Sequence, residues 1–342
     1  AVALAARRLG DLALAIVAVM TAGIGVARAL WTVPELSASA MTALIGLPVL
    51  ARDLPTVVDA LRALALPALL LAGLRLALPP VPLGARRALP IAAGAFAIAA
   101  LYVWYKQAFG LADHDDFAAR GLLERTILTQ ALFLLGWLLG SGRVKAPRLE
   151  PDLVRLAGTA VTAFAAARLI WFDLFFHNPA WAEQWVGTLP VLNLILPAYL
   201  LSAVWLYLAR RRADQATRSG FWLAAFLAAL VAGTMLLVRQ GFQGPILTGA
   251  DMPIAEFYTY SLAGLAVSIG LIVAGMRLPD KALRLAGLVL LTGTIVKVFL
   301  VDASELEGVW RILSFLGLGV ALIGIGRLYG PVLRAERPAE RS

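Results

Sequence analysis

Apolar residues occur in long blocks along most of this chain, separated by short segments that carry the charges. The blocks are about 17–22 residues long, the length of helix that crosses about 30 Å of hydrocarbon at 1.5 Å per residue. A helix on the surface of a soluble protein would have a polar face, and most of these blocks have none. The pattern therefore predicts an all-α fold, a polytopic bundle of transmembrane helices.

We predict about ten spans, each ending where charged residues or turn formers begin. In chain order they are Leu12–Ala29, Ala63–Leu78, Ile91–Phe109, Gly121–Leu139, Ala157–Phe176, Leu189–Leu208, Phe221–Val238, Phe257–Gly275, Leu285–Val301 and Ile312–Tyr329. The segment from Leu36 to Ala51 is apolar too, but Pro48 interrupts it. It is short for a span, so we expect an interfacial or re-entrant helix there.

The basic residues predict which side of the membrane each loop faces. One set of alternate loops holds 19 of the 30 Lys and Arg residues, and the other set holds 3. Because short cytoplasmic loops are enriched in Lys and Arg, both termini are expected in the cytoplasm. Segments 141–155, 209–220 and the tail should be cytoplasmic, and 110–120, 174–187 and 240–255 external. The net charge of +9 follows from this bias, and we expect no nucleic-acid partner.

Several sequence elements recur about 130 residues apart, which predicts parallel internal repeats of four helices. Arg155-Leu-Ala-Gly leads to Arg168 and Asp173, as Arg284-Leu-Ala-Gly, 129 residues later, leads to Lys297 and Asp302. Lys106-Gln107-Ala-Phe109 and Arg239-Gln240-Gly-Phe242 end the third and seventh spans, and Glu124 and Glu256 lie near the start of the spans that follow. We therefore divide the chain into a first repeat, 1–150, a second repeat, 151–282, and a C-terminal half repeat with a cytoplasmic tail, 283–342.

Eight charged residues near the predicted outer ends of the helices are the candidate site. They are Lys106, Arg168, Asp173, Arg239, Glu256, Lys297, Asp302 and Arg311. A charge inside a span costs about 2.5–3.5 kcal/mol on insertion scales, so it is seldom without a role. One interpretation is structural, with cations that extend to lipid phosphates or form ion pairs between helices. The other is an outward polar pocket for an anionic or hydroxyl-rich ligand, since guanidinium groups bind carboxylate and phosphate in a fork.

Lys297 and Asp302 are expected to find partners on other helices. Five residues place two side chains about 140° apart around a regular helix, so the two cannot pair on a shared face. Arg311, Glu256 and Arg239 are the candidates, because all three are predicted at outer helix ends. The sequence thus predicts that Lys297 faces the bundle interior near a carboxylate.

Several classes of chemistry find no support in the sequence. The chain has no cysteine and only two histidines, His114 and His177, so we expect no metal and no cofactor. Asp113-His-Asp-Asp116 is interpreted as a solvated acidic loop, and His177-Asn-Pro179 as a turn at a helix end. There is no P-loop, no dinucleotide fingerprint and no HExxH motif.

The chain resembles the bacterial multi-pass membrane family known as domain of unknown function 2339, most specifically over residues 256–329. The resemblance rests on Lys297-Val-Phe-Leu-Val-Asp302, Leu306-Glu-Gly308, Trp310-Arg-Ile-Leu-Ser-Phe-Leu-Gly-Leu-Gly319, Glu256-Phe-Tyr-Thr-Tyr-Ser261 and Phe172-Asp173 with His177-Asn-Pro179. Members of that family are longer, and this chain starts at Ala1 without Met. The resemblance therefore implies a bacterial inner-membrane protein, of which this chain is a C-terminal portion with further helices upstream. It supplies no catalytic residues.

Three functions remain open at this point. The first is a membrane protein that binds or passes an envelope glycan or lipid through the outward pocket. The second is a membrane enzyme that modifies such a molecule, with Asp173 or Asp302 as acid or base. The third is a scaffold for partner helices, in which the ion pairs are structural. The expected partners are the lipid bilayer, an envelope polysaccharide or lipid, and the upstream helices; whether the chain is an enzyme is left open.

Overall fold

The structure is a computed structural model of the 342-residue chain. It describes residues 32–77, 83–142, 151–190, 192–213, 216–249 and 251–300, with isolated positions in 16–27 and 316–327. Regular structure in these residues is helical. The chain divides into two compact units, Ala1–Val186 and Gly187–Ser342, and each is described by itself. The three segments expected from the sequence stay a prediction.

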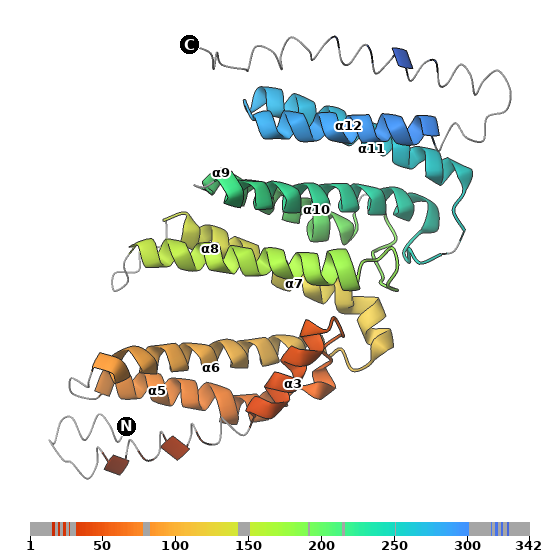
Figure 1. Cartoon of the computed structure of the whole chain (residues 1–342). Coiled ribbons are helices and arrows are strands. Elements are labelled where there is room, and N and C mark those ends of the chain that lie inside the picture. Colours follow the sequence, from red (N-terminus) through yellow and green to blue (C-terminus); the bar gives the residue numbers. More distant parts are fainter. Residues whose placement is uncertain are drawn as a thin grey trace, which may run out of the picture. The chain divides into compact units, whose positions relative to one another are not determined.

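The first unit consists of two long helical hairpins with a short helix before them (Figure 1). Its elements are α3 (Val33–Leu44), the 3-10 turn η1 (Ala51–Asp53), α4 (Val57–Ala60), the π-helix η2 (Leu61–Ala65), α5 (Leu66–Ala77), α6 (Leu83–Phe109), α7 (His114–Gly140), α8 (Pro151–Arg168) and the π-helix η3 (Leu169–Phe176). Helix α5 packs against α6, and α7 against α8. Asp113 starts α7 as its N-cap, because its carboxylate accepts from the Asp116 backbone N–H at 2.9 Å. The acidic sequence Asp113-His-Asp-Asp116, interpreted above as a solvated loop, therefore also forms the first turn of α7.

The second unit also contains two hairpins. Its elements are the π-helix η4 (Leu196–Leu201), α9 (Ser202–Arg212), α10 (Ala216–Gln243), α11 (Ile254–Arg277) and α12 (Lys281–Leu300). Helix α9 packs against α10, α11 against α12, and α10 also contacts α11 (Figure 1). The sequence predicts a helix from Leu189, but the helical segment begins only with η4. Asn193 caps this later start, since its side-chain oxygen accepts from the Leu196 backbone N–H at 3.0 Å.

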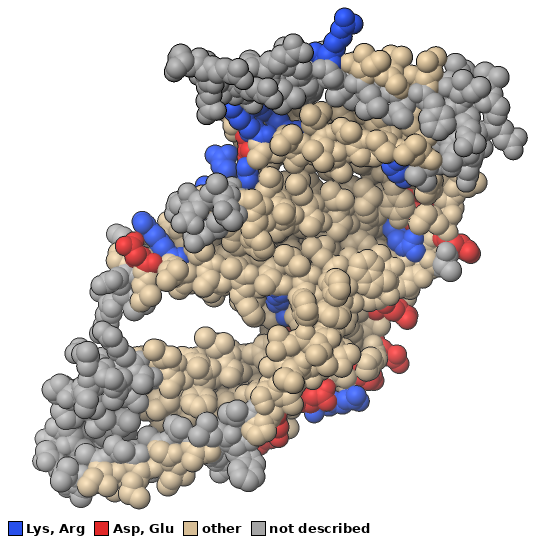
Figure 2. Space-filling model, viewed as in Figure 1, with Lys and Arg blue, Asp and Glu red and all other residues tan. Residues whose placement is uncertain are grey.

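Five helical segments in the described residues are long and apolar enough to cross a membrane. They are His114–Gly140, Pro151–Phe176, Gly220–Gln243, Ile254–Arg277 and Lys281–Leu300. Between 11% and 39% of the apolar 18-residue stretch of each helix is buried inside the protein, so most of each stretch is left for a lipid environment to cover. On the face shown in Figure 2, the hairpin flanks carry few charges, and Lys, Arg, Asp and Glu gather mainly near helix ends. The multi-pass membrane architecture is therefore confirmed.

Some of the predicted spans are not among these five segments. The first and the tenth lie mostly outside the described residues. Residues 57–77 form a continuous helical run through α4, η2 and α5, but this run is not among the five segments. The apolar segment between the first two spans contains α3, a 12-residue helix of about 18 Å. It is too short to cross a bilayer, as expected for an interfacial or re-entrant helix.

Glycines bring the helices of the α7/α8 and α11/α12 hairpins close together. A Cβ on Gly158 of α8 would lie 2.3 Å from the Gly140 backbone nitrogen of α7. A Cβ on Gly287 of α12 would lie 2.9 Å from the Ile272 backbone nitrogen of α11. These are the glycines of the two Arg-Leu-Ala-Gly sequences, so each of those sequences marks a close helix crossing.

Candidate functional site

The first buried ion pair of unit one joins the end of α6 to the N-terminal half of α7. The Lys106 ammonium lies 3.2 Å from Glu124 Oε2, and the two side chains are 8% and 0% exposed. Within the described part of the chain, neither carboxylate oxygen of Glu124 receives a well-aligned hydrogen bond. The Tyr105 hydroxyl donates to the Glu124 backbone carbonyl at 2.5 Å. Glu124 therefore has a cation beside it but lacks the hydrogen bonds that normally accompany a buried carboxylate.

The second buried ion pair joins α7 to η3. Arg125 Nε donates to Asp173 Oδ1 at 2.8 Å, and both side chains are 3% exposed. Arg125 Nη2 also donates to Gln184 Oε1 at 3.2 Å. In the sequence, Asp173 follows Arg168 within the repeat, and Arg125 is not among the eight candidate residues. The signal that could have found it is a second charged residue directly after Glu124 in an otherwise apolar span.

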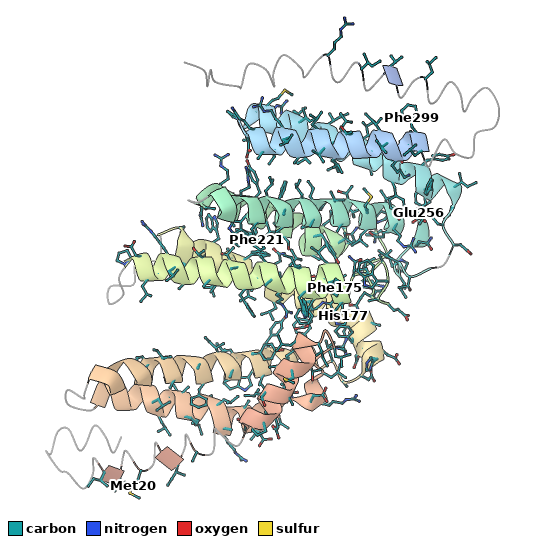
Figure 3. The ribbon with its side chains drawn as sticks, viewed as in Figure 1. Met20, Phe175, His177, Phe221, Glu256 and Phe299 are labelled. Atoms are coloured by element: carbon teal, nitrogen blue, oxygen red, sulfur yellow. The ribbon has the colours of Figure 1, made fainter. Side chains whose placement is uncertain are left out.

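His177 lies against this second pair, at the end of the α7/α8 hairpin (Figure 3). Its ring packs on Phe117 and Phe172, with centroid distances of 4.9 and 6.2 Å. Burial and, to a smaller extent, the nearby Arg125 charge lower the pKa of His177 to about 4, although a hydrogen bond with the Gly46 backbone opposes both. His177 is therefore neutral at physiological pH. This agrees with a packing and turn role.

Arg168 lies in the region of the first ion pair. Its guanidinium carbon is 5.2 Å from the centroid of the Phe172 ring, a cation–π distance. The charges of Arg168 and Glu124 both act on Tyr102 and Tyr105 of α6. The structure thus brings Lys106, Arg168 and Asp173 to one end of the helices of unit one, with Asp173 held by a different arginine.

In unit two, Arg239 of α10 pairs with Glu256 at the start of α11 (Figure 3). The Arg239 Nη1 to Glu256 Oε1 distance is 3.1 Å. Glu256 is fully buried, and it also accepts from the Tyr260 hydroxyl at 2.7 Å and from Gln243 Nε2 at 3.1 Å. Three donors satisfy this carboxylate, so its burial is well compensated.

Lys297 of α12 contacts α11. Its ammonium donates to Ser261 Oγ at 2.6 Å and to the Phe257 carbonyl at 3.2 Å, and it lies 3.8 Å from the centroid of the Phe257 ring. The side chain is half-buried at the hairpin interface. The other two predicted site residues, Asp302 and Arg311, lie outside the described residues.

A polar cleft of about 670 Å³ opens in unit one beside α3, η1, α4 and η2. The side chains that give it its chemistry are Glu35, Arg52, Asp53, Thr56, Asp59 and Arg62. Thr56 Oγ1 donates to Asp59 Oδ2 at 2.7 Å. None of the eight predicted site residues is among the described residues that line the cleft. The sequence did not reveal it because its walls come from a short helix and irregular turns.

The cleft lies at the same end of unit one as the loop between α6 and α7. The Ala51 backbone N–H donates to the Leu111 carbonyl at 2.8 Å, and Leu50 packs with Leu111 and Phe117. Lys106 and Glu124 flank that loop in sequence. The cleft and the buried ion pairs thus share one end of the unit.

The chemistry open to these groups is ionic binding, hydrogen bonding and proton exchange. Among the residues that the structure describes, no group of three or more His, Asp or Glu side chains is placed to hold a metal ion. At the opposite end of unit two, Arg210 forms an ion pair with Asp280, and hydrogen bonding from Arg210 lowers the pKa of Asp280. Buried pairs therefore occur at both ends of the helices.

Comparison with known proteins gives one match. The family model described as "Predicted membrane protein (DUF2339)" matches residues 1–331. Neither the search of curated proteins nor the search of solved structures finds a match. The matched range covers all the residues of the candidate site.

Proposed function

The chain belongs to the DUF2339 family of predicted membrane proteins, and on that premise we propose that it binds a hydroxyl-rich envelope ligand, a glycan or a lipid head group. The polar cleft of unit one is the proposed binding site. Its volume, about 670 Å³, is in the range of small-molecule sites. This cleft is the observation on which the proposal rests.

The charges of the cleft favour a neutral or zwitterionic ligand. Three carboxylates, Glu35, Asp53 and Asp59, face two guanidinium groups, Arg52 and Arg62. Carboxylates accept hydrogen bonds from hydroxyl groups, and guanidinium groups donate to hydroxyl or phosphate oxygens. A strongly anionic polymer would be repelled by the carboxylates. Sugar hydroxyls and polyol head groups suit both kinds of side chain.

The location that we propose is the outer face of a bacterial inner membrane. The loop bias of Lys and Arg supports cytoplasmic termini. In this arrangement the other predicted spans, beyond the five long apolar segments, cross the membrane as well. The bond from Ala51 to Leu111 ties the cleft to the loop expected outside. A ligand of the cell envelope would then reach the cleft without crossing the bilayer.

Matching contacts in the two units support the four-helix repeat. Lys106–Glu124 and Arg239–Glu256 each join the end of one long helix to the N-terminal half of the next. The neighbouring glutamines also correspond: Gln107 donates to the Pro55 carbonyl at 2.9 Å and Gln240 to the Gly187 carbonyl at 2.8 Å. In each unit the glutamine bonds to an irregular segment that lies before a π-helix in the chain, η2 in unit one and η4 in unit two.

Cross-linking in the membrane tests the binding site. A benzophenone side chain in place of Thr56, which lines the cleft, should capture a sugar-containing molecule or a lipid on irradiation of cells. The matched control is the same group at Ser141, at the far end of α7 in the same unit. A sugar-containing adduct at 56 alone supports a glycan, and a lipid adduct at 56 alone supports a head group. Equal lipid capture at both positions, or no capture at 56, contradicts the proposal.

One observation supports the alternative function, a scaffold in which ion pairs hold helices together. Glu256 is satisfied by three donors within unit two, so the Arg239–Glu256 pair is complete without a ligand. We propose that this pair joins helices, while unit one holds the binding site.

A further inference from the structure

We propose that Lys106 and Glu124 form an intramembrane proton-exchange site. Their charged groups are 3.2 Å apart and almost completely buried. Both oxygens of Glu124 lack an aligned donor in the described part of the chain. The site binds and releases one proton, and it is distinct from the polar cleft, whose described lining contains neither residue.

The residue types permit the exchange. A buried ion pair loses the hydration of both ions, which costs several kcal/mol per ion before the two attract each other. A lysine can relieve this cost by releasing its proton, because a buried ammonium is far easier to deprotonate than a guanidinium. One Nζ–H bond breaks, the electron pair stays on nitrogen, and the proton passes to water. Neutral Lys106 then remains beside the Glu124 carboxylate.

Burial of the ammonium and the positive charges around the pair favour release of that proton, whereas the Glu124 carboxylate opposes it. Helix α8 contributes Arg168, whose positive charge acts on Lys106, and α7 contributes Arg125, which acts on it more weakly. Arg125 is balanced by Asp173 of η3. Helix α6 contributes the hydroxyl groups of Tyr102 and Tyr105. The cluster therefore has three cations and two carboxylates, and deprotonation of Lys106 makes its charge neutral.

The equivalent pair in unit two provides an internal comparison. There the cation is Arg239, and a guanidinium keeps its proton in proteins; three donors bond to the Glu256 carboxylate. The same position in the two units thus has an exchangeable cation in one and a fixed cation in the other. A purely structural role would not need this difference.

Nitrogen NMR of the lysine side chains measures the exchange directly. The chain has four lysines, Lys106, Lys145, Lys281 and Lys297, so ¹⁵N-lysine labelling of the full chain in lipid nanodiscs gives few Nζ signals. Each is assigned by a Lys→Arg variant. We expect the Lys106 Nζ signal to change from the ammonium to the amine form within the pH range over which the chain stays folded, because burial disfavours the ammonium. A Lys106 signal with no protonation change in that range overturns the proposal.

Two variants show whether Glu124 belongs to the site. Glu124→Gln should move the Lys106 titration to lower pH by about one unit or more, because the ammonium loses its counter-ion. Glu256→Gln is the matched control and should leave it unchanged. If Glu124→Gln does not fold, Arg168→Gln serves instead and should move the titration to higher pH. An unchanged midpoint in the folded variant contradicts the proposal.

Discussion

Buried carboxylates in this protein lie beside cations from other helices. Glu124, Asp173 and Glu256 are 0%, 2% and 0% exposed, and each has a Lys or Arg nitrogen within 3.2 Å. Taking an ion out of water costs several kcal/mol, so each charge depends on its partner. Removal of one partner leaves the other charge buried and uncompensated.

The Arg125–Asp173 pair provides the clearest test of this dependence. Arg125→Met should lower the free energy of unfolding by about 3–5 kcal/mol, since it leaves the Asp173 carboxylate without its buried cation. Chemical unfolding in detergent measures the change. Arg120→Gln is the control, because Arg120 forms an exposed pair with Asp116, and it should cost under about 1 kcal/mol.

A double variant separates the pair from the rest of the packing. Asp173→Asn combined with Arg125→Met should cost less than the sum of the single variants, because no unpaired charge remains. Strict additivity would show that the two side chains do not interact.

His177 makes stability depend on pH. Its pKa is lowered from 6.5 to about 4 in the folded protein, so below pH 6.5 the unfolded chain binds a proton that the native state does not. Stability should therefore fall as the pH is lowered from about 6.5 towards about 4, and His177 contributes fully above that window. The measurement is Tm at about pH 7 and about pH 5, for wild type and for His177→Phe. Wild type should lose more Tm than the variant; equal losses would contradict the assignment.

At the scale of helices, hairpin packing relies on small residues at the crossings. Gly158 lies against the α7 backbone, and Gly287 against that of α11. Lipid tails are as apolar as leucine, so membrane helices associate through close packing and hydrogen bonds. The glycine crossings are therefore expected to contribute to the stability of each hairpin.

Gly158→Ala should destabilise the α7/α8 hairpin. The added Cβ would lie 2.3 Å from the Gly140 nitrogen, and backbone cannot move away as a flexible side chain can, so a loss of about 1–3 kcal/mol is expected. Gly293→Ala in α12 is the control, since nothing lies within 4 Å of a Cβ there. Thermal unfolding should show a lower Tm for the first variant alone. Similar Tm values for both would show that the hairpin can separate without cost.

At the scale of the whole molecule, the distribution of charge predicts the orientation in the membrane. Because the chain has no cysteine, single cysteines can report which side a loop faces. A cysteine at position 116, near the start of α7, should react with an impermeant maleimide in intact cells. A cysteine at position 215, between α9 and α10, should react only after lysis. The reverse pattern would contradict the topology.

The sequence alone determined the membrane architecture and the location of the costly charges. Block length and the absence of polar faces specify spanning helices through local properties, namely hydropathy and a fixed rise per residue. The same reasoning places Lys106, Arg239 and Glu256 at helix ends, because an unneutralised charge is expelled from the middle of a span. These conclusions need no knowledge of which helices touch.

Only the tertiary structure decided which charges pair and where a ligand could bind. Asp173 pairs with Arg125, 48 residues away, and no local pattern encodes that choice, since it depends on how α7 and η3 pack. The polar cleft is likewise built from turns between Leu50 and Arg62 whose shape follows from contacts such as Ala51 with Leu111. Glu124 and Glu256 look equivalent in sequence, yet one lacks aligned donors and the other has three. The difference arises because hydrogen bonds act over about 3 Å and therefore depend on the folded arrangement of distant residues.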